Sequence, residues 1–147
     1  MVIAVDFDGT IVEHAYPRIG KEIPFAIATL KRLRAERHLL ILWTVREGKL
    51  LEEAVEFCRR RGLEFYAVNR NYPEESDEAI VRCRKINADF FIDDLNVGGL
   101  PDWGLIYEMI TRGTSFKELS REVTNRGSET REGFLHRLFK KVIHKRT

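Results

Sequence analysis

Runs of mostly apolar residues recur along the chain, and stretches with helical periodicity separate them. The runs cover residues 2–5, 39–43, 65–68 and 88–92. The first run, VIAV, shows no alternation of apolar and polar positions. This pattern is typical of a strand that is covered on both faces in a parallel sheet. We therefore interpret these runs as the strands of such a sheet.

Apolar residues spaced three or four positions apart predict helices between and after these strands. The first helix begins at Pro24, the second ends before Gly62, the third is capped by Ser76 or Asp77, and the fourth begins at Pro101. Alternating strands and helices imply right-handed crossovers. The sequence thus predicts an α/β fold with a three-layer, doubly wound parallel sheet.

Polar side chains directly follow three of the predicted strands. They are Asp6 and Asp8 after the first strand, Thr44 after the second, and Asp93 and Asp94 after the fourth. Open α/β sheets bind ligands at this edge. Carboxylates one residue apart at the end of a buried strand are costly unless a positive charge lies between them, and a bound divalent cation is the simplest source. Carboxylate oxygens without His or Cys favour magnesium over zinc.

The overall charge and the cysteines narrow the classes of partner. With 25 Lys and Arg against 23 Asp and Glu, the 147-residue chain has a net charge of +2, so we expect neither nucleic acid nor a membrane surface as its partner. We see no signal peptide and no stretch long enough to span a membrane. Cys58 and Cys83 lack metal-ligand spacing, which favours small buried residues in a reducing cytoplasm. We therefore expect a cytoplasmic protein.

The sequence DFDGT at residues 6–10 follows a hydrophobic strand, and an acidic pair closes a later strand. In this order, these elements resemble the signature of the haloacid dehalogenase-like (HAD) phosphohydrolases. The resemblance implies a Rossmann-like core in which the first and fourth strands are neighbours. It implies that Asp6 is the nucleophile and becomes phosphorylated, and that Asp8 is the general acid and base. The magnesium ligands that it implies are Asp6, Asp8, Asp93 and Asp94.

Two further catalytic residues follow from the same resemblance. Members of the family place a Ser or Thr at the end of the second strand, where it hydrogen-bonds the transferring phosphoryl group, and Thr44 matches this position. They also keep a Lys before the later acidic pair, which offsets negative charge and holds the phosphoryl oxygens. Lys85 fits that order better than Lys49 does. The alternative for Lys85 is an ordinary solvated charge on a helix.

Four more residues are candidates for contacts with the substrate. Gly9 and Thr10 belong to the motif itself, where Gly9 lets the backbone turn sharply and Thr10 adds a hydroxyl. Arg46 follows Thr44 closely and could add a charge-assisted contact to phosphate, with a surface ion pair to a Glu as the alternative. Asn69 lies at the carboxyl end of the third strand, although Asn is also common in loops.

The segments in which family members carry cap domains are short. Residues 11–23 are too short for a helical cap, and residues 69–85 have room for a loop and one helix. The resemblance is therefore to the small capless bacterial type, with an open site that a flap at residues 16–21 shields in part. We interpret His14, in the same segment, as a surface residue.

The end of the chain lies outside the part that the resemblance covers. We assign residues 1–113 to the core and residues 114–147 to a helical extension. Residues 128–147 carry apolar positions at helical spacing with basic residues between them. We expect this amphipathic helix to pack on its own core or on a second subunit of a homo-oligomer. A basic face toward anionic lipid or nucleic acid is the alternative.

The resemblance implies a magnesium-dependent phosphomonoester hydrolase that acts through an aspartyl-phosphate on a phosphorylated small molecule or a larger phosphorylated substrate. Two alternatives stay open. One is a phospho-acceptor signalling module that resembles the receiver domain of a response regulator. In that family the acceptor Asp follows the third strand, and no Asp closes the third strand here. The other is a non-catalytic binding protein on a HAD scaffold.

Overall fold

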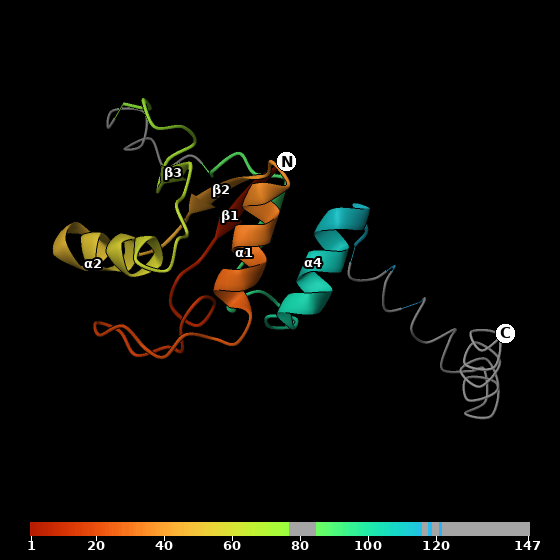
Figure 1. Cartoon of the computed structure of the whole chain (residues 1–147), viewed down its shortest axis with the longest axis horizontal. Coiled ribbons are helices and arrows are strands. Elements are labelled where there is room, and N and C mark those ends of the chain that lie inside the picture. The colour runs from red at the N-terminus through yellow and green to blue at the C-terminus, as the bar shows by residue number, and fades with distance from the viewer. Residues whose placement is uncertain (77–84, 116–117, 119–120, 122–147) are drawn as a thin grey trace, which may run out of the picture. The chain divides into compact units, whose positions relative to one another are not determined.

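The structure of the chain is a computed structural model that describes residues 1–76, 85–115, 118 and 121 (Figure 1). The chain divides into two compact units, Met1–Tyr107 and Glu108–Thr147. The first unit contains the sheet and the candidate site. The predicted boundary between core and extension at residue 113 stays a prediction.

The first unit is built on a parallel sheet of four strands. The strands are β1 (Val2–Val5), β2 (Leu39–Leu42), β3 (Ala67–Val68) and β4 (Phe90–Ile92). Their order in the sheet is β3-β2-β1-β4, and every neighbouring pair is parallel. Val5 lies opposite both Leu42 and Ile92. The predicted parallel sheet is confirmed, and so is the expectation that the first and fourth strands are neighbours.

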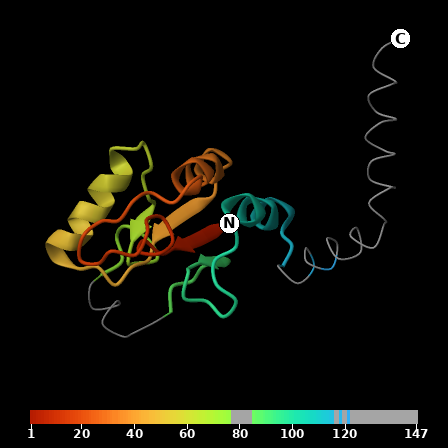
Figure 2. The ribbon, with the colours of Figure 1, turned by 90° about the horizontal axis from the view of Figure 1, so that it is seen from below.

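Helices flank the sheet, which makes this an α/β fold. The described helices are α1 (Ala26–Ala35), α2 (Gly48–Arg59) and α4 (Trp103–Arg112). Figures 1 and 2 show α1 and α2 on the same side of the sheet. The helix α1 begins two residues after Pro24 because Phe25, its N-cap, has a left-handed φ of 68°. The third predicted helix, from residue 76 or 77 to about 86, lies largely outside the described residues.

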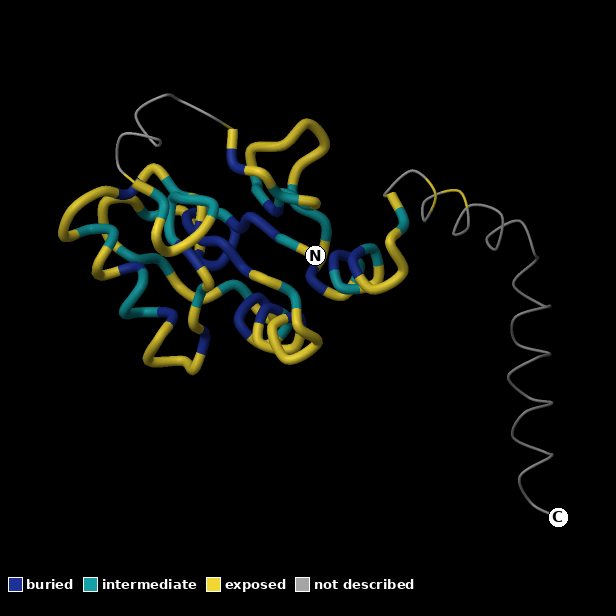
Figure 3. Tube along the Cα trace, turned by 90° about the horizontal axis from the view of Figure 1, so that it is seen from above, coloured by how far each residue is buried: buried dark blue, intermediate teal, exposed yellow. Residues whose placement is uncertain are grey.

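Aliphatic side chains of the strands form the core. Ile3, Val5, Ile41 and Leu42 are fully buried, and Figure 3 shows the strands as the buried interior beneath exposed loops. Burial of one such side chain stabilises the fold by about 1.5–3 kcal/mol. The polar residues that are buried in the described part of the chain are Asp8, Thr10 and Arg46. All of them follow β1 or β2 directly, so the unusual polarity of the interior is concentrated at the carboxyl edge of the sheet.

The segment after β1 forms a small hairpin-like loop and contains no helix. Val12 bridges Glu22 in antiparallel fashion, and the Glu13 and Ile23 amides donate to the carbonyls of Lys21 and Ile11. The prediction of a flap without a helical cap in this segment is confirmed.

In the described part of the second unit, Ser115 and Glu118 exchange hydrogen bonds. The Ser115 hydroxyl accepts a hydrogen bond from the Glu118 amide, and the Glu118 carboxylate accepts one from the Ser115 amide. This reciprocal pattern is that of a capping box. The amphipathic helix that we predict over residues 128–147 lies outside the described residues. None of the described helices is both long and apolar enough to cross a bilayer.

Candidate functional site

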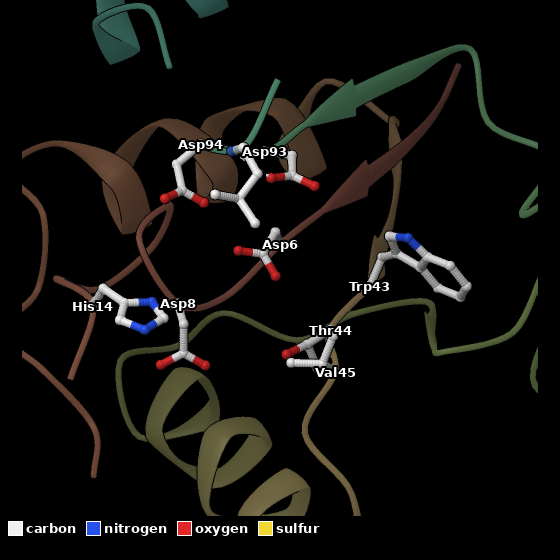
Figure 4. Close-up of a pocket in the computed structure, with 9 residues that line it drawn as sticks. Asp6, Asp8, His14, Trp43, Thr44, Val45, Asp93 and Asp94 are labelled. Atoms are coloured by element: carbon white, nitrogen blue, oxygen red, sulfur yellow. Dashed lines mark hydrogen bonds between the residues drawn. The ribbon is translucent and has the colours of Figure 1, made fainter. Parts of the chain in front are cut away.

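Three carboxylates meet at the carboxyl edge of the sheet. Asp6 follows β1, and Asp93 and Asp94 follow β4. Because Val5 and Ile92 are paired in register, the residues after them leave the sheet at the same place. One oxygen from each of Asp6, Asp93 and Asp94 lies within 4.8 Å of the others. Figure 4 shows the three side chains converging on one pocket.

This cluster carries negative charge that the described residues do not balance. The pKa of Asp6 is raised to about 7. Burial is the largest cause, the charges of Asp93, Asp94 and Asp8 also raise it, and a hydrogen bond from the Phe7 amide opposes them. The Asp94 Oδ1 atom is buried and has no hydrogen-bond partner in the described part of the chain. A buried carboxylate oxygen of this kind is costly unless it is ligated. Three hard oxygen donors fit a divalent cation such as Mg²⁺.

Gly9 and Thr10 hold Asp94 in this cluster. The Asp94 amide donates a hydrogen bond of 3.1 Å to the buried Thr10 hydroxyl. Gly9 has a φ of +90°, and a Cβ at this position would lie 2.2 Å from the Asp94 Oδ2 atom. Neither residue lines the pocket. The contacts of Gly9 and Thr10 with Asp94 show that both residues support the acidic cluster. Their expected contact with the substrate stays a prediction.

Asp8 is paired with Arg46 and lies outside the acidic cluster. The Arg46 guanidinium donates to both carboxylate oxygens of Asp8, at 2.6 and 2.7 Å, and the two side chains are 0% and 6% exposed. Bidentate charge-assisted bonds of this kind are strong and fix orientation. The Asp8 carboxylate is therefore engaged by Arg46 and is not part of the acidic cluster, although Asp8 does line the pocket. That Asp8 is a ligand of the metal stays a prediction.

Arg46 also fastens the flap to the sheet. Its guanidinium donates to the carbonyls of Pro17 and Arg18, at 3.0 and 2.9 Å, and lies over the rings of Phe7 and Tyr16. A side chain that is fully buried and makes these contacts is not available to a substrate. This geometry contradicts both sequence-based predictions for Arg46, a contact to phosphate and a surface ion pair with a Glu.

Asn69 fixes the backbone of Thr44. Its amide group donates to the Thr44 carbonyl at 2.9 Å and accepts from the Thr44 amide at 2.8 Å. Asn69 has a φ of 52°, a conformation that Asn tolerates better than most residues. Thr44 lines the pocket where the sequence predicted it, but Asn69 does not, so its role is to position Thr44.

Lys85 does not reach the pocket. It precedes β4, whereas the pocket lies after the carboxyl end of that strand. Its ammonium group lies 4.6 Å from the centre of the Phe91 ring, and its side chain is exposed. The expectation that Lys85 holds the phosphoryl group is corrected. The order of the sequence motifs suggested it, but the strand separates it from the acidic cluster.

The pocket has a volume of about 340 Å³. Its lining residues are Asp6, Asp8, His14, Trp43, Thr44, Val45, Asp93, Asp94 and Leu95. Sequence reasoning missed His14, Trp43, Val45 and Leu95. Three of these are sequence neighbours of predicted site residues, because Trp43 and Val45 flank Thr44 and Leu95 follows Asp94. That adjacency could have indicated them as lining residues. His14 had only its place in the flap.

Comparison with known proteins gives one structural relative. No protein-family model matches the chain, and no curated protein matches it. The structure of a conserved protein from Bacteroides thetaiotaomicron is similar, with 66% sequence identity and a TM-score of 0.75. The match covers 81% of this chain and 96% of that protein. The description of that protein says that it is conserved and names no activity.

The close approach of Gly9 to Asp94 predicts an effect on metal binding. Gly9→Ala places a Cβ against the Asp94 carboxylate, so the affinity for Mg²⁺ should fall by about tenfold or more, as it does when groups that support metal ligands are removed. Calorimetric titration with MgCl₂ measures this. Gly98→Ala is the matched control, because Gly98 has a φ of +101° and open space around its Cβ position. Equal affinities in the two variants would contradict the packing argument.

The raised pKa of Asp6 predicts a pH-dependent effect of magnesium on stability. The folded-state pKa of about 7 exceeds the ordinary value of 3.8, so the folded chain binds more protons and its metal-free stability falls as pH rises through this window. Saturating Mg²⁺ should therefore raise the melting temperature more at pH 8 than at pH 5. Melts of Asp6→Asn should lose most of this difference. A magnesium effect that is equal at both pH values in the wild type would contradict the cluster as described.

The buried ion pair predicts a large loss of stability when Arg46 is removed. Arg46→Leu leaves the buried Asp8 carboxylate unpaired, which should lower the free energy of unfolding by about 3–5 kcal/mol. Urea unfolding measures this. Arg59→Leu is the control, because Arg59 pairs with Glu56 at 2.6 Å while its side chain is 66% exposed, and such surface pairs contribute about 0–1 kcal/mol. Similar losses in both variants would show that Arg46 is not specially stabilising.

Proposed function

The chain belongs to the same family as the conserved Bacteroides thetaiotaomicron protein, and we propose that it is a magnesium-dependent phosphomonoester hydrolase with a doubly wound, HAD-like core. The observation that carries this proposal is the cluster of Asp6, Asp93 and Asp94, with carboxylate oxygens within 4.8 Å of one another in a pocket that Thr44 also lines. Carboxylates gathered from two strand ends, beside a hydroxyl from a third, form a site suited to phosphoryl transfer.

Magnesium is the cofactor of this proposal. Asp6, Asp93 and Asp94 would hold the ion, and the unpartnered Oδ1 atom of Asp94 supports this assignment. When bound, magnesium would neutralise charge on the phosphoryl oxygens. No Lys or Arg is among the described residues that line the pocket. The activity should therefore depend strictly on the metal, because no lining side chain other than His14 can supply positive charge.

Asp6 is the proposed nucleophile. Its carboxylate oxygen attacks phosphorus, the bond from phosphorus to the leaving-group oxygen breaks, and an aspartyl-phosphate forms. Water then attacks the same phosphorus, and the bond to Asp6 breaks as inorganic phosphate is released. A nucleophile must be ionised, and a carboxyl with a pKa of about 7 is only partly ionised near neutral pH. A cation beside Asp6 favours the ionised form.

Asp8 is the proposed base of the second step. Both of its oxygens accept hydrogen bonds from Arg46, and each carboxylate oxygen keeps a second lone pair that can accept a proton from the attacking water. In the first step of the next turnover, Asp8 would donate the proton that it took from this water to the leaving-group oxygen, after loosening one bond to Arg46. Arg46 acts as a positioning residue for Asp8.

Thr44 is the proposed donor to the phosphoryl group. Its hydroxyl lies at the carboxyl end of β2, and Asn69 holds both the amide and the carbonyl of Thr44 in place. A donor with a fixed backbone costs little reorganisation during the reaction. Asn69 therefore supports the proposed chemistry without touching the substrate.

The nucleophile assignment predicts the effect of one substitution. Asp6→Asn is nearly isosteric but cannot attack phosphorus, so the turnover of p-nitrophenyl phosphate with magnesium should fall by at least about 10³-fold, while circular dichroism shows an unchanged fold. Asp102→Asn is the control, because the Asp102 carboxylate caps α4 through the Leu105 amide and Asn caps helices equally well. Turnover of Asp6→Asn near the wild-type value would refute the covalent mechanism.

A further inference from the structure

The pocket has exposed apolar side chains on two sides of Asp6, with Trp43 and Val45 after β2 and Leu95 after β4. Trp43, Val45 and Leu95 line the pocket, and they are 37%, 83% and 88% exposed. Exposed apolar side chains that line a polar site often mark a binding surface, and Trp43 is the largest of the three. The proposed chemistry uses none of these side chains. Their place beside the proposed nucleophile suggests that they contact the part of the substrate that leaves.

The charges of the pocket limit what that part can be. Asp8 is paired with Arg46, so the uncompensated lining charges are the carboxylates of Asp6, Asp93 and Asp94, and one bound divalent cation would balance two of these three. No described lining residue is a Lys or Arg. A leaving group with a second phosphate or a carboxylate would be repelled. A sugar would bury hydroxyl groups against a wall that offers few hydrogen-bond partners, which is also costly. An uncharged, apolar leaving group avoids both costs.

The indole of Trp43 is presented from a fixed backbone. The Trp43 amide donates to the Val5 carbonyl at 2.8 Å, and the next residue, Thr44, is held by Asn69. Figure 4 shows Trp43 and His14 on opposite sides of Asp6 in that view. The Trp43 indole is adjacent in sequence to Thr44, the proposed hydrogen-bond donor to the phosphoryl group. Its flat aromatic surface is best matched by a second aromatic ring.

Resting on the proposed function, we propose that the pocket selects phosphomonoesters whose leaving group carries an uncharged aromatic ring that packs on Trp43. Benzyl phosphate and glucose 6-phosphate test this selectivity, because both leaving groups are primary alcohols with similar intrinsic reactivity. The wild-type protein should have the higher kcat/KM for benzyl phosphate. Equal or inverted values would overturn the proposal.

The variant Trp43→Ala tests the residue itself. The KM for benzyl phosphate should rise roughly 5- to 10-fold with little change in kcat, and glucose 6-phosphate should change by less than about twofold. Trp43→Phe keeps a ring and should recover most of the loss. Tyr66→Ala is the control, because Tyr66 is a 41% exposed aromatic residue at the amino end of β3 that does not line the pocket. A loss of kcat for both substrates would overturn the proposal and show that Trp43 only supports Thr44.

A phosphotyrosyl peptide with uncharged neighbours separates two sources of an aromatic phosphate. If Trp43→Ala raises its KM as it does for benzyl phosphate, the aromatic contact is supported, and the substrate with the lower KM indicates whether a protein side chain or a small molecule is the better source. A KM for the peptide that is the same in wild type and Trp43→Ala would count against the contact.

Calorimetry with benzylphosphonate and magnesium separates failure of this proposal from failure of the proposed function. If no phosphomonoester is hydrolysed but benzylphosphonate binds and Trp43→Ala weakens binding, the hydrolase proposal is wrong and the aromatic subsite stands. If hydrolysis occurs and benzylphosphonate binds equally to wild type and Trp43→Ala, the aromatic subsite is wrong and the hydrolase proposal stands. Absence of both hydrolysis and binding would overturn both proposals.

Discussion

Repulsion among carboxylates at the edge shared by β1 and β4 is the constraint on which the site depends. The pairing of Val5 with Ile92 forces the residues that follow these strands together. This arrangement has two costs: the pKa of Asp6 is raised, and one buried oxygen of Asp94 has no hydrogen-bond partner among the described residues. A bound cation relieves both costs, so the same packing that destabilises the empty arrangement creates affinity for a metal.

The positive charge of Arg46 compensates the negative charge of Asp8, so Asp8 adds little to the repulsion within the acidic cluster. The Arg46 guanidinium neutralises Asp8 and joins the flap to the loops after β1 and β2. The acidic residues of the motif are thereby divided, with Asp6 in the cluster and Asp8 in an ion pair. This division suits the proposed chemistry, because a nucleophile near a cation and a base beside a guanidinium have different environments.

Strand patterns predicted most of this arrangement, but side-chain partners could not be predicted. Asp6, Thr44, Asp93 and Asp94 were found because each directly follows a buried strand and parallel strands end at one edge. Arg46 and Asn69 lie near the site as the sequence predicted, but they contact protein groups instead of substrate. Their partners, Asp8 and the Thr44 backbone, are distant in sequence, so these contacts could not be predicted. Lys85 was placed by motif order alone, although a residue that shortly precedes β4 in sequence lies toward the amino end of that strand, away from the acidic cluster.

Chemical trapping of the intermediate tests the central claim, that Asp6 accepts the phosphoryl group in a magnesium-dependent step. Borohydride reduces an acyl phosphate to an alcohol, so a protein quenched during turnover should carry homoserine at position 6, detected by mass spectrometry of the N-terminal peptide. The account predicts this modification with magnesium and substrate present, and its loss when either is omitted. Release of phosphate with an unmodified Asp6 under the same conditions would contradict it.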